Sequence, residues 1–409
     1  MKRSPRVPFR SQVLWLFLLA ARTTFAGWNF TPPADPNRNW EVTVKGGTTY
    51  DDNFDATEKN RQSGFKVGGG ITLRASVPLE RFLMGMQYEY DVDYPRDIKL
   101  GGVDETHNVN AAVEYSFNPR LALSLSENYV DSLQPQLVLG PANAPVTIVQ
   151  AGTYVYNNVG GNLSFSVTRR WTLSVSGSWD IWRYQVSSIA SNNDHQDYSM
   201  TVSALYSLDP RTTVGLNYQY GDTTYVFPGP RNGLNATSDT GYLSLVRRFN
   251  PQLSASINGG YTIRKSQDGT VSTSPSAYGS LVYNYGPENT LALTVAESLS
   301  EATLQGTRQY SAQQNTSFSL QAEHRLTARL RASADLTYTY STFTAPLLPG
   351  LTVKPSEQAL TGHLGLNYAF RDWLSAVMDY YYSKLGSSDP ILIQPYDRNR
   401  ISLGMTVTY

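Results

Sequence analysis

Residues 253–264 read Leu-Ser-Ala-Ser-Ile-Asn-Gly-Gly-Tyr-Thr-Ile-Arg, so that apolar and polar side chains alternate along the stretch. Successive side chains of a β-strand point to opposite faces, and this period of two therefore predicts one strand with an apolar face and a polar face. The same alternation begins again at Phe82, Trp171 and Leu330, and no segment shows a helical period of comparable strength. The chain is predicted to be all-β.

Short turn-like clusters divide the chain into repeats. Examples are Asn-Pro-Arg at 118–120 and Asp-Pro-Arg at 209–211, and successive clusters lie 36 to 50 residues apart. Between two clusters lie two alternating stretches, joined by a looser segment rich in Gly, Asn, Asp and Pro. Each repeat therefore predicts one long hairpin. About eighteen strands result, with sixteen as the alternative count.

This pattern predicts a transmembrane antiparallel up-and-down β-barrel with short periplasmic turns and longer outer loops. An even number of strands returns both termini to one side, as in single-chain bacterial barrels. A soluble β-propeller repeats at a similar interval but needs four strands in each repeat. Here each repeat holds two strands, most of them long enough to cross a bilayer at a tilt. A β-helix would have shorter rungs.

Composition excludes several other classes of protein. The chain has 409 residues, of which 16% are charged and none is cysteine, whereas soluble domains carry about 25% charged residues. No apolar run reaches the roughly 20 residues of a spanning helix, which excludes a polytopic helical membrane protein. The lack of cysteine excludes disulfides, zinc–cysteine clusters and thiol catalysis. A formal net charge of zero gives no support to nucleic-acid binding.

The N-terminus has the features of an export signal. A basic start, at positions 2, 3, 6 and 10, precedes the apolar run Val13–Ala21, and Thr24 and Ala26 supply the small residues of a cleavage site. An N-terminal anchor helix is the alternative, but nine apolar residues are too few to span a bilayer. We expect a cleaved secretory signal peptide over residues 1–26, a short periplasmic segment over 27–39 and a single outer-membrane β-barrel over 40–409.

Aromatic residues on the predicted apolar face gather near both strand ends. Tyrosines lie near the long loops: Tyr50, Tyr90, Tyr129, Tyr220, Tyr261, Tyr340 and Tyr382. A second set lies near the tight turns: Trp40, Phe82, Phe117, Trp171, Phe249, Phe370 and Trp373. Two aromatic girdles around an apolar band are typical of barrels that cross a bilayer. Ordinary β-propensity explains a single tyrosine, but not the clustering at both ends.

The last strand has the most regular alternation. Its apolar residues occupy every second position up to an aromatic C-terminus: Ile401, Leu403, Met405, Val407 and Tyr409. This ending resembles the C-terminal assembly signal of bacterial outer-membrane proteins, which implies handling by periplasmic chaperones and the barrel-assembly machinery. The alternative is an ordinary amphipathic closing strand. Together, the assembly signal and the export signal predict an integral protein of the bacterial outer membrane, in contact with lipid and lipopolysaccharide.

The alternate residues of these strands are predicted to line the interior. The charged candidates for lumen lining are Lys45, Lys66, Arg74, Glu89, Asp91, Asp93, Glu114, Arg264, Arg329, Arg331, Asp335, Asp379 and Arg400. Barrels of sixteen to eighteen strands leave an aqueous channel, so we expect passive diffusion of small hydrophilic solutes or oligosaccharides. The acids from Glu89 to Asp93 and the bases at 329 and 331 form either opposed walls or salt bridges between neighbouring strands. Because both signs occur, the sequence predicts no ion preference.

Other motifs carry little chemistry. The apolar loop segments Leu137–Pro141 and Thr147–Val149 either fold inward as a constriction or pack on their neighbours. Asp51–Asp55 favours a turn with Asx caps over a calcium loop, which would need a different placement of Gly and Glu. The adjacent Asp194 and His195 have no activated serine beside them in the sequence. We therefore expect no enzyme, no catalytic residue, no metal and no cofactor.

The segment Val42–Phe54, Val-Thr-Val-Lys-Gly-Gly-Thr-Thr-Tyr-Asp-Asp-Asn-Phe, resembles the opening of the putative β-barrel porin 2 family. The tight turn and alternating strand at Asn118–Leu125 are similar too, and the resemblance extends over nearly all of residues 40–409. It implies an outer-membrane barrel without catalytic residues, and some relatives accompany exopolysaccharide production. The alternatives to a porin are therefore a barrel for export of an extracellular polysaccharide and a structural or adhesive barrel with a plugged lumen. Whether the barrel forms a homo-oligomer is open.

Overall fold

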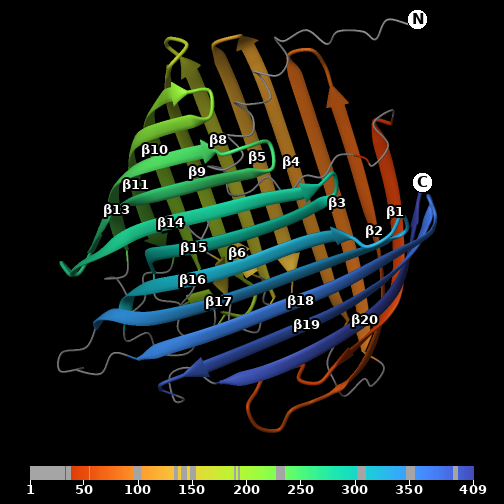
Figure 1. Cartoon of the computed structure of the whole chain (residues 1–409). Helices are drawn as coiled ribbons and strands as arrows, with labels where there is room; N and C mark the ends of the chain where they lie inside the picture. The colour runs from red at the N-terminus through yellow and green to blue at the C-terminus, as the bar shows by residue number, and fades with distance from the viewer. Residues whose placement is uncertain are drawn as a thin grey trace, which may run out of the picture.

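The computed structural model describes residues 33, 38–54, 56–95, 103–132, 137–139, 145–147, 153–187, 190–191, 194–226, 235–301, 310–346, 355–389 and 395–409. Within these residues, eighteen strands form one closed antiparallel sheet, and two short strands pair apart from it (Figure 1). The predicted all-β barrel is confirmed, with eighteen strands. The predicted signal peptide lies outside the described residues. No helix among the described residues has the length and hydropathy to cross a membrane.

The strands follow one another around the barrel in chain order. Their bounds are β1 (Trp40–Asp51), β2 (Gly64–Pro78), β3 (Phe82–Pro95), β4 (Asp104–Asn118), β5 (Leu121–Ser132), β6 (Leu137–Leu139), β7 (Pro145–Thr147), β8 (Tyr154–Ser166), β9 (Trp171–Tyr184), β10 (His195–Asp209), β11 (Thr212–Tyr225), β12 (Ala236–Arg248), β13 (Leu253–Ser266), β14 (Val271–Gly286), β15 (Asn289–Glu301), β16 (Tyr310–Arg325), β17 (Leu330–Pro346), β18 (Ser356–Arg371), β19 (Leu374–Ser387) and β20 (Tyr396–Thr408). β6 and β7 pair only with each other, in the connection between β5 and β8. The hypothesis of an inward-folding constriction also involves residues 140, 141, 148 and 149, which lie outside the described residues, and it stays a prediction.

The barrel strands have 12 to 17 residues. At about 3.4 Å per residue and a tilt near 40°, a strand of 13 residues spans roughly 33 Å, enough for a bilayer. Tight connections of two to four residues join the strands at the end where β1 begins and β20 ends; we call this the turn end and the opposite one the loop end. One expected long loop is wrong, because Gln267–Thr270 joins β13 to β14 in four residues. Gly269 makes this turn with a φ of +87°, which a glycine adopts without strain.

The outward face of the sheet is apolar and accessible. Leu216, Leu243 and Ile257 are among its most exposed side chains. The residues of both aromatic girdles lie on this face, and several are more than one-third exposed: Trp40, Tyr50, Phe117, Trp171, Tyr220, Phe249, Tyr261, Tyr340, Phe370 and Trp373. Such exposure would be unfavourable in water but suits a surface surrounded by lipid.

The first and last strands close the barrel at a seam. β1 pairs with β20 from Thr43 opposite Thr408 to Asp51 opposite Arg400, and the two strands meet at the right of Figure 1. Closure leaves the eighteen-stranded sheet without an unpaired edge. Gly47 faces inward at the middle of this seam, where an added Cβ would lie 2.4 Å from the carbonyl oxygen of Leu403. The two backbones therefore approach more closely than a larger residue allows.

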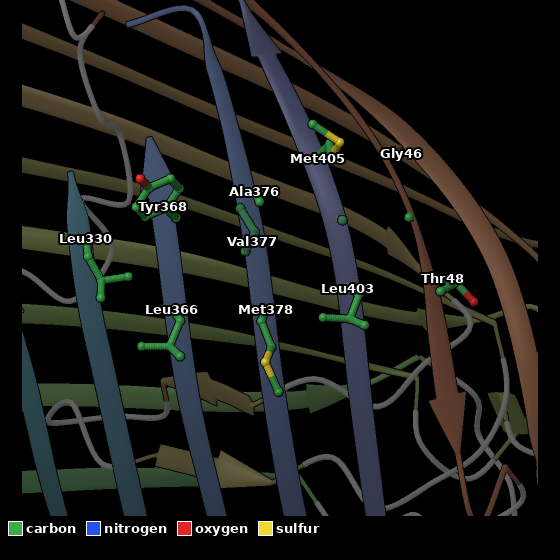
Figure 2. Close-up of a pocket in the computed structure, with 12 residues that line it drawn as sticks. Gly46, Thr48, Leu330, Leu366, Tyr368, Ala376, Val377, Met378, Leu403 and Met405 are labelled. Atoms are coloured by element: carbon green, nitrogen blue, oxygen red, sulfur yellow. The ribbon is translucent and has the colours of Figure 1, made fainter. Parts of the chain in front are cut away.

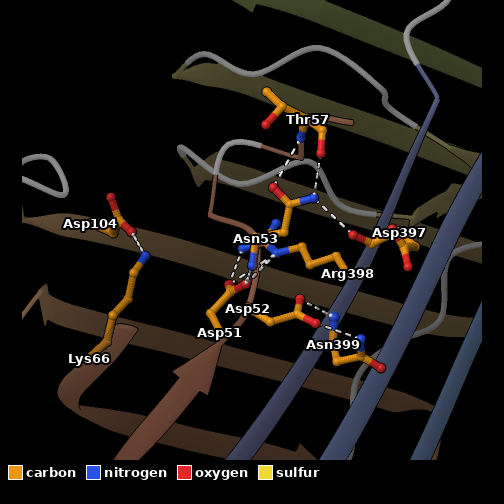
Figure 3. Close-up of polar contacts among 9 residues, drawn as sticks. All are labelled: Asp51, Asp52, Asn53, Thr57, Lys66, Asp104, Asp397, Arg398 and Asn399. Atoms are coloured by element: carbon orange, nitrogen blue, oxygen red, sulfur yellow. Dashed lines mark hydrogen bonds and ion pairs between the residues drawn. The ribbon is translucent and has the colours of Figure 1, made fainter. Parts of the chain in front are cut away.

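A polar cluster holds the loop end of the seam, which we call the seam latch: Asp51, Asp52, Asn53, Arg398 and Asn399 (Figure 3). The Arg398 guanidinium donates from Nε to both Asp51 carboxylate oxygens at 3.0 Å and from Nη2 to one of them, and both side chains are buried. Asn399 donates from its backbone N and from Nδ2 to the Asp52 carboxylate, at 2.7 and 2.6 Å. The backbone N–H of Asn53 donates to Asp51 Oδ1 at 3.0 Å, so the predicted Asx turn is confirmed.

Candidate functional site: the inner wall of the barrel

The pairing register assigns one face of every strand to the interior. Lys45 of β1 lies opposite Gly70 of β2, which lies opposite Asp91 of β3, and the same counting extends around the barrel. Twelve of the thirteen predicted lining residues fall on this inner face: Lys45, Lys66, Arg74, Glu89, Asp91, Asp93, Glu114, Arg264, Arg331, Asp335, Asp379 and Arg400. Arg329 lies instead in the tight turn before β17.

The inner wall has two unlike halves. Most charged side chains lie on β17–β20 and β1–β4, which we call the charged half. On β5–β16, the middle of the inner face carries mainly Ser, Thr, Asn and Gly, which we call the hydroxyl half. Hydrogen bonds link its side chains across neighbouring strands: Ser174 to Asn162 at 2.6 Å, Thr240 with Thr262 at 2.9 Å, and Asn217 to Ser244 at 3.0 Å. Such a lining exchanges hydrogen bonds readily with water or a polar solute.

Lys45 is the centre of an ion-pair cluster on the charged half. Its Nζ lies 2.6 Å from Glu89 Oε1 and 2.8 Å from Asp91 Oδ1, although β2 separates the two strands. The contact passes over Gly70, where an added Cβ would lie 2.1 Å from Asp91 Oδ1 and 2.8 Å from Lys45 Cε. The absence of a side chain at Gly70 therefore lets the ion pairs lie flat against the wall.

Salt bridges also engage several other basic residues of this half. Lys66 pairs with Asp104 on β4, and Arg74 Nη1 lies 2.5 Å from Glu41 Oε1 on β1. Arg331 Nη2 lies 2.7 Å from Glu288 Oε2 in the turn between β14 and β15. Of the two arrangements that the sequence allows, salt bridges between nearby strands are therefore the one present. A basic wall opposed to the acidic one does not form around Arg331.

His363 forms a second cluster with two carboxylates. Its Nδ1 lies 3.1 Å from Asp335 Oδ2 and its Nε2 lies 2.9 Å from Asp379 Oδ1. The imidazole stacks on the Tyr381 ring at 4.5 Å between centroids, and the Arg400 guanidinium lies 5.0 Å from the same ring centre. The sequence analysis did not place His363 in the lumen. The alternation along β18 could have predicted its position, because it places His363 and Glu357 on the same, inward face.

The inner wall is open at the turn end and filled at the loop end. Along the inner face of β17, Arg331 at the turn end is 67% exposed, whereas Phe343 at the loop end is fully buried. Tyr154 and Leu385 are likewise buried at the loop ends of β8 and β19. The lumen therefore narrows toward the loop end.

An aromatic cluster occupies this narrow end on β8 and β9. The Tyr156 and Trp182 rings lie 4.2 Å apart between centroids, and Tyr154 and Tyr184 pack beside them. Asp180 accepts hydrogen bonds from Tyr156 Oη and Asn158 Nδ2, both at 2.7 Å. The sequence analysis missed this cluster, since alternation alone does not distinguish inward tyrosines from those of a girdle.

Asp194, which precedes β10, and His195, the first residue of β10, make separate contacts. Asp194 accepts the backbone N–H of Tyr184 at 2.8 Å, and burial raises the pKa of its carboxyl above the usual value. His195 Nε2 lies 3.4 Å from Asp197 Oδ2 on its own strand. These contacts are not those of a nucleophile with its base. Among the described residues, no three His, Cys, Asp or Glu side chains are arranged so that they could hold a metal ion.

A shallow groove on the outside of the barrel is apolar. It crosses β17–β20 and β1, and Leu366, Met378 and Leu403 line its middle (Figure 2). These side chains belong to the face that carries the aromatic girdles. The groove therefore faces lipid, and the inner wall is the candidate functional site.

Three solved structures are similar to this chain at little sequence identity. OccAB3 of Acinetobacter baumannii is 12% identical, with 90% of this chain and 99% of that chain covered and a TM-score of 0.46. OccK2 (OpdF) of Pseudomonas aeruginosa, in complex with glucuronate, is 11% identical, with 90% and 98% covered and a TM-score of 0.46. The siderophore receptor PirA of P. aeruginosa is 11% identical, with 92% and 81% covered and a TM-score of 0.43.

Family comparison is more specific than these likenesses of fold. None of the curated proteins matches the chain. A family model described as putative beta-barrel porin 2 matches residues 145–409, which is well over half of the chain and includes every strand from β8 to β20. With its closed barrel, lipid-compatible exterior and polar interior, this chain belongs to the putative beta-barrel porin 2 family, a family of porin-like outer-membrane barrels.

Proposed function

We propose that this protein is a channel through which small hydrophilic solutes diffuse passively across the outer membrane. The observation that carries the proposal is the polar inner wall of a closed eighteen-stranded barrel, with hydroxyl and amide groups on one half and ion pairs on the other. A dry core would leave these groups without water and be strongly unfavourable. Barrels of this strand number enclose an aqueous channel.

Conductance of the refolded protein in a planar bilayer tests this function. We expect discrete, stable current steps, because ions cross wherever water fills a continuous lumen. Blocking of those steps by neutral oligosaccharides of increasing size would then measure the solutes admitted. Absence of steps from protein with the heat-modifiable mobility of a folded barrel would contradict the proposal.

The filled loop end favours a second candidate function. Tyr154, Phe343 and Leu385 are buried on the inner face there, so the lumen of a structural or adhesive barrel would be closed at this end. A channel for export of an extracellular polysaccharide shares the same polar wall and would need the narrow end to open. Folded protein that conducts no current would favour the structural or adhesive barrel, or the export channel, over the passive channel.

We also propose that the C-terminal strand is read by the barrel-assembly machinery. Tyr409 pairs through its backbone with Val42 at 2.8 Å, and its ring lies 5.7 Å from that of Trp40. Its side chain remains mostly exposed, so truncation removes little packing. We expect Y409S to lower the amount of protein in the outer membrane severalfold, and Y409F to preserve it.

Refolding of the purified variants separates assembly from stability. If Tyr409 acts as an assembly signal, Y409S refolds in detergent with nearly the urea midpoint of the unmodified protein while its level in cells falls. Equal levels of Y409S and Y409F in the outer membrane would contradict this role.

A further inference from the structure

The charged half carries both accessible and buried charges. Asp335, Lys45 and Asp91 are 44%, 36% and 33% exposed, whereas the side chains of Lys66 and Arg398 are only 8% and 9% exposed. Lys66 and Arg398 are each neutralised by a carboxylate in the wall. The potential that a solute meets in the lumen therefore depends chiefly on the net charge of the accessible clusters, because buried ion pairs present little net charge.

The partners within each cluster are unequal in number. Lys45 is shared between Glu89 and Asp91, which leaves one net negative charge. His363 lies between Asp335 and Asp379, which leaves two negative charges when the imidazole is neutral and one when it is protonated. Both clusters are therefore negative in either protonation state of His363.

Further charged groups face the same part of the wall. The Asp93 carboxylate lies over Gly68, where an added Cβ would be 1.9 Å from Oδ1. Arg400 is positive and lies between the two clusters, over the Tyr381 ring. Arg331 is positive too and lies at the turn end, where it shares Glu288 with Arg325, so that this cluster carries one net positive charge away from the other two. Asp93 and Arg400 offset one another, and the excess of negative charge in the two clusters persists.

Glycines keep both negative clusters flat against the wall. Gly70 underlies the first, and Gly365 underlies the second, where an added Cβ would lie 2.4 Å from Ser333 Oγ and 3.1 Å from Asp379 Oδ1. The carboxylates therefore line the lumen without obstructing it. Across the lumen, the described inner face of the hydroxyl half carries Asp180, Asp197 and Arg264 toward the loop end, and its other charged side chains lie within three residues of a tight turn. No basic wall therefore cancels the field of the two clusters.

We propose that the charged half is the selectivity element of the lumen and makes the channel prefer cations and cationic solutes over anions. The inference rests on the proposed channel function. Fixed charges in a narrow aqueous passage with low-dielectric walls raise the local concentration of counter-ions. The preference is therefore assigned to this wall rather than to the net charge of the chain.

Reversal potentials under a tenfold KCl gradient test the proposal. For the unmodified channel we expect potassium to permeate about threefold or more better than chloride at low salt, and this ratio to fall toward one near 1 M salt, where screening reaches about 3 Å. D335N/D379N and E89Q/D91N should each lower the ratio, and K45Q should raise it. This salt dependence requires no variant and holds even if a substituted barrel fails to fold.

D239N is the matched control. Asp239 is a carboxylate on the outward face of β12, where it accepts a hydrogen bond from Tyr218 Oη at 2.5 Å, and its removal should leave the ratio unchanged. A conducting channel that prefers chloride or has no preference at low salt would overturn the inference and leave the channel function standing. A shift by D239N as large as that by D335N/D379N would also overturn it. Folded protein without conductance would overturn the channel function itself.

Discussion

R398M is expected to destabilise the barrel by about 3–5 kcal/mol, because it leaves the buried Asp51 carboxylate without its partner. The guanidinium donates three hydrogen bonds to that carboxylate, and both groups are buried at the loop end of the seam. Methionine preserves the length of the side chain but has no donor. Urea unfolding of the refolded protein, followed by the heat-modifiable shift in gel mobility, measures the loss.

An exposed ion pair beside the latch is the control. Arg61 pairs with Asp397, which lies on the same strand as Arg398, but the side chains of Arg61 and Asp397 are both exposed. R61M should therefore change stability by less than about 1 kcal/mol. The double variant D51L/R398M, which removes both charges, should recover much of the loss. Equal urea midpoints for R398M and R61M would contradict the role of the seam latch in closure.

G47A is expected to destabilise closure by about 3 kcal/mol, since backbone atoms of β20 must move to admit one methyl group. An added Cβ at Gly47 would lie 2.4 Å from the carbonyl oxygen of Leu403 and 2.9 Å from the Cα of Gly404. A flexible side chain can rotate away from such a contact, whereas a paired strand cannot. The measurement is the yield of heat-modifiable barrel on refolding, together with its urea midpoint.

The neighbouring glycine offers a matched control for this substitution. Gly46 lies in the same seam but faces outward, and an added Cβ there would meet nothing within 4 Å. G46A should therefore refold with the yield and midpoint of the unmodified protein. If G47A refolds as well as G46A, the first and last strands do not require the close approach described here.

The strands and their faces could be predicted from sequence because a barrel wall repeats one local rule. Alternation with a period of two assigned Leu253 to lipid and Arg264 to the lumen without knowledge of any partner. The length of the connection between β13 and β14 was predicted wrongly, because alternation does not show where a tight turn can form. Gly269 allows a four-residue turn between β13 and β14, where the polar sequence around it resembles an ordinary long loop.

The contacts within the lumen could not be predicted in the same way. Lys45 meets Asp91 across an intervening strand and over Gly70, so the contact depends on the register of two hairpins and on the absence of one side chain. The pairing of Asp51 with Arg398 depends on closure between the two ends of the chain. From the sequence alone, Asp51 was recognisable as part of an Asx turn, but its cationic partner was not.

The filled loop end is the feature of the structure that bears most on function. Arg331 and Phe343 lie on the same inner face of β17, yet one is exposed and the other buried. Alternation gives both residues the same side and says nothing about how far the lumen stays open along a strand. The lumen-lining residues thus follow from sequence, while the width of the lumen does not.

Single-channel recording of the refolded, heat-modifiable barrel in a planar bilayer is the most direct test of a continuous water-filled path through this protein. The structure predicts discrete current steps of uniform size, which rise with salt concentration and persist in D239N. Protein that inserts and remains folded but passes no current at any salt concentration would contradict the account.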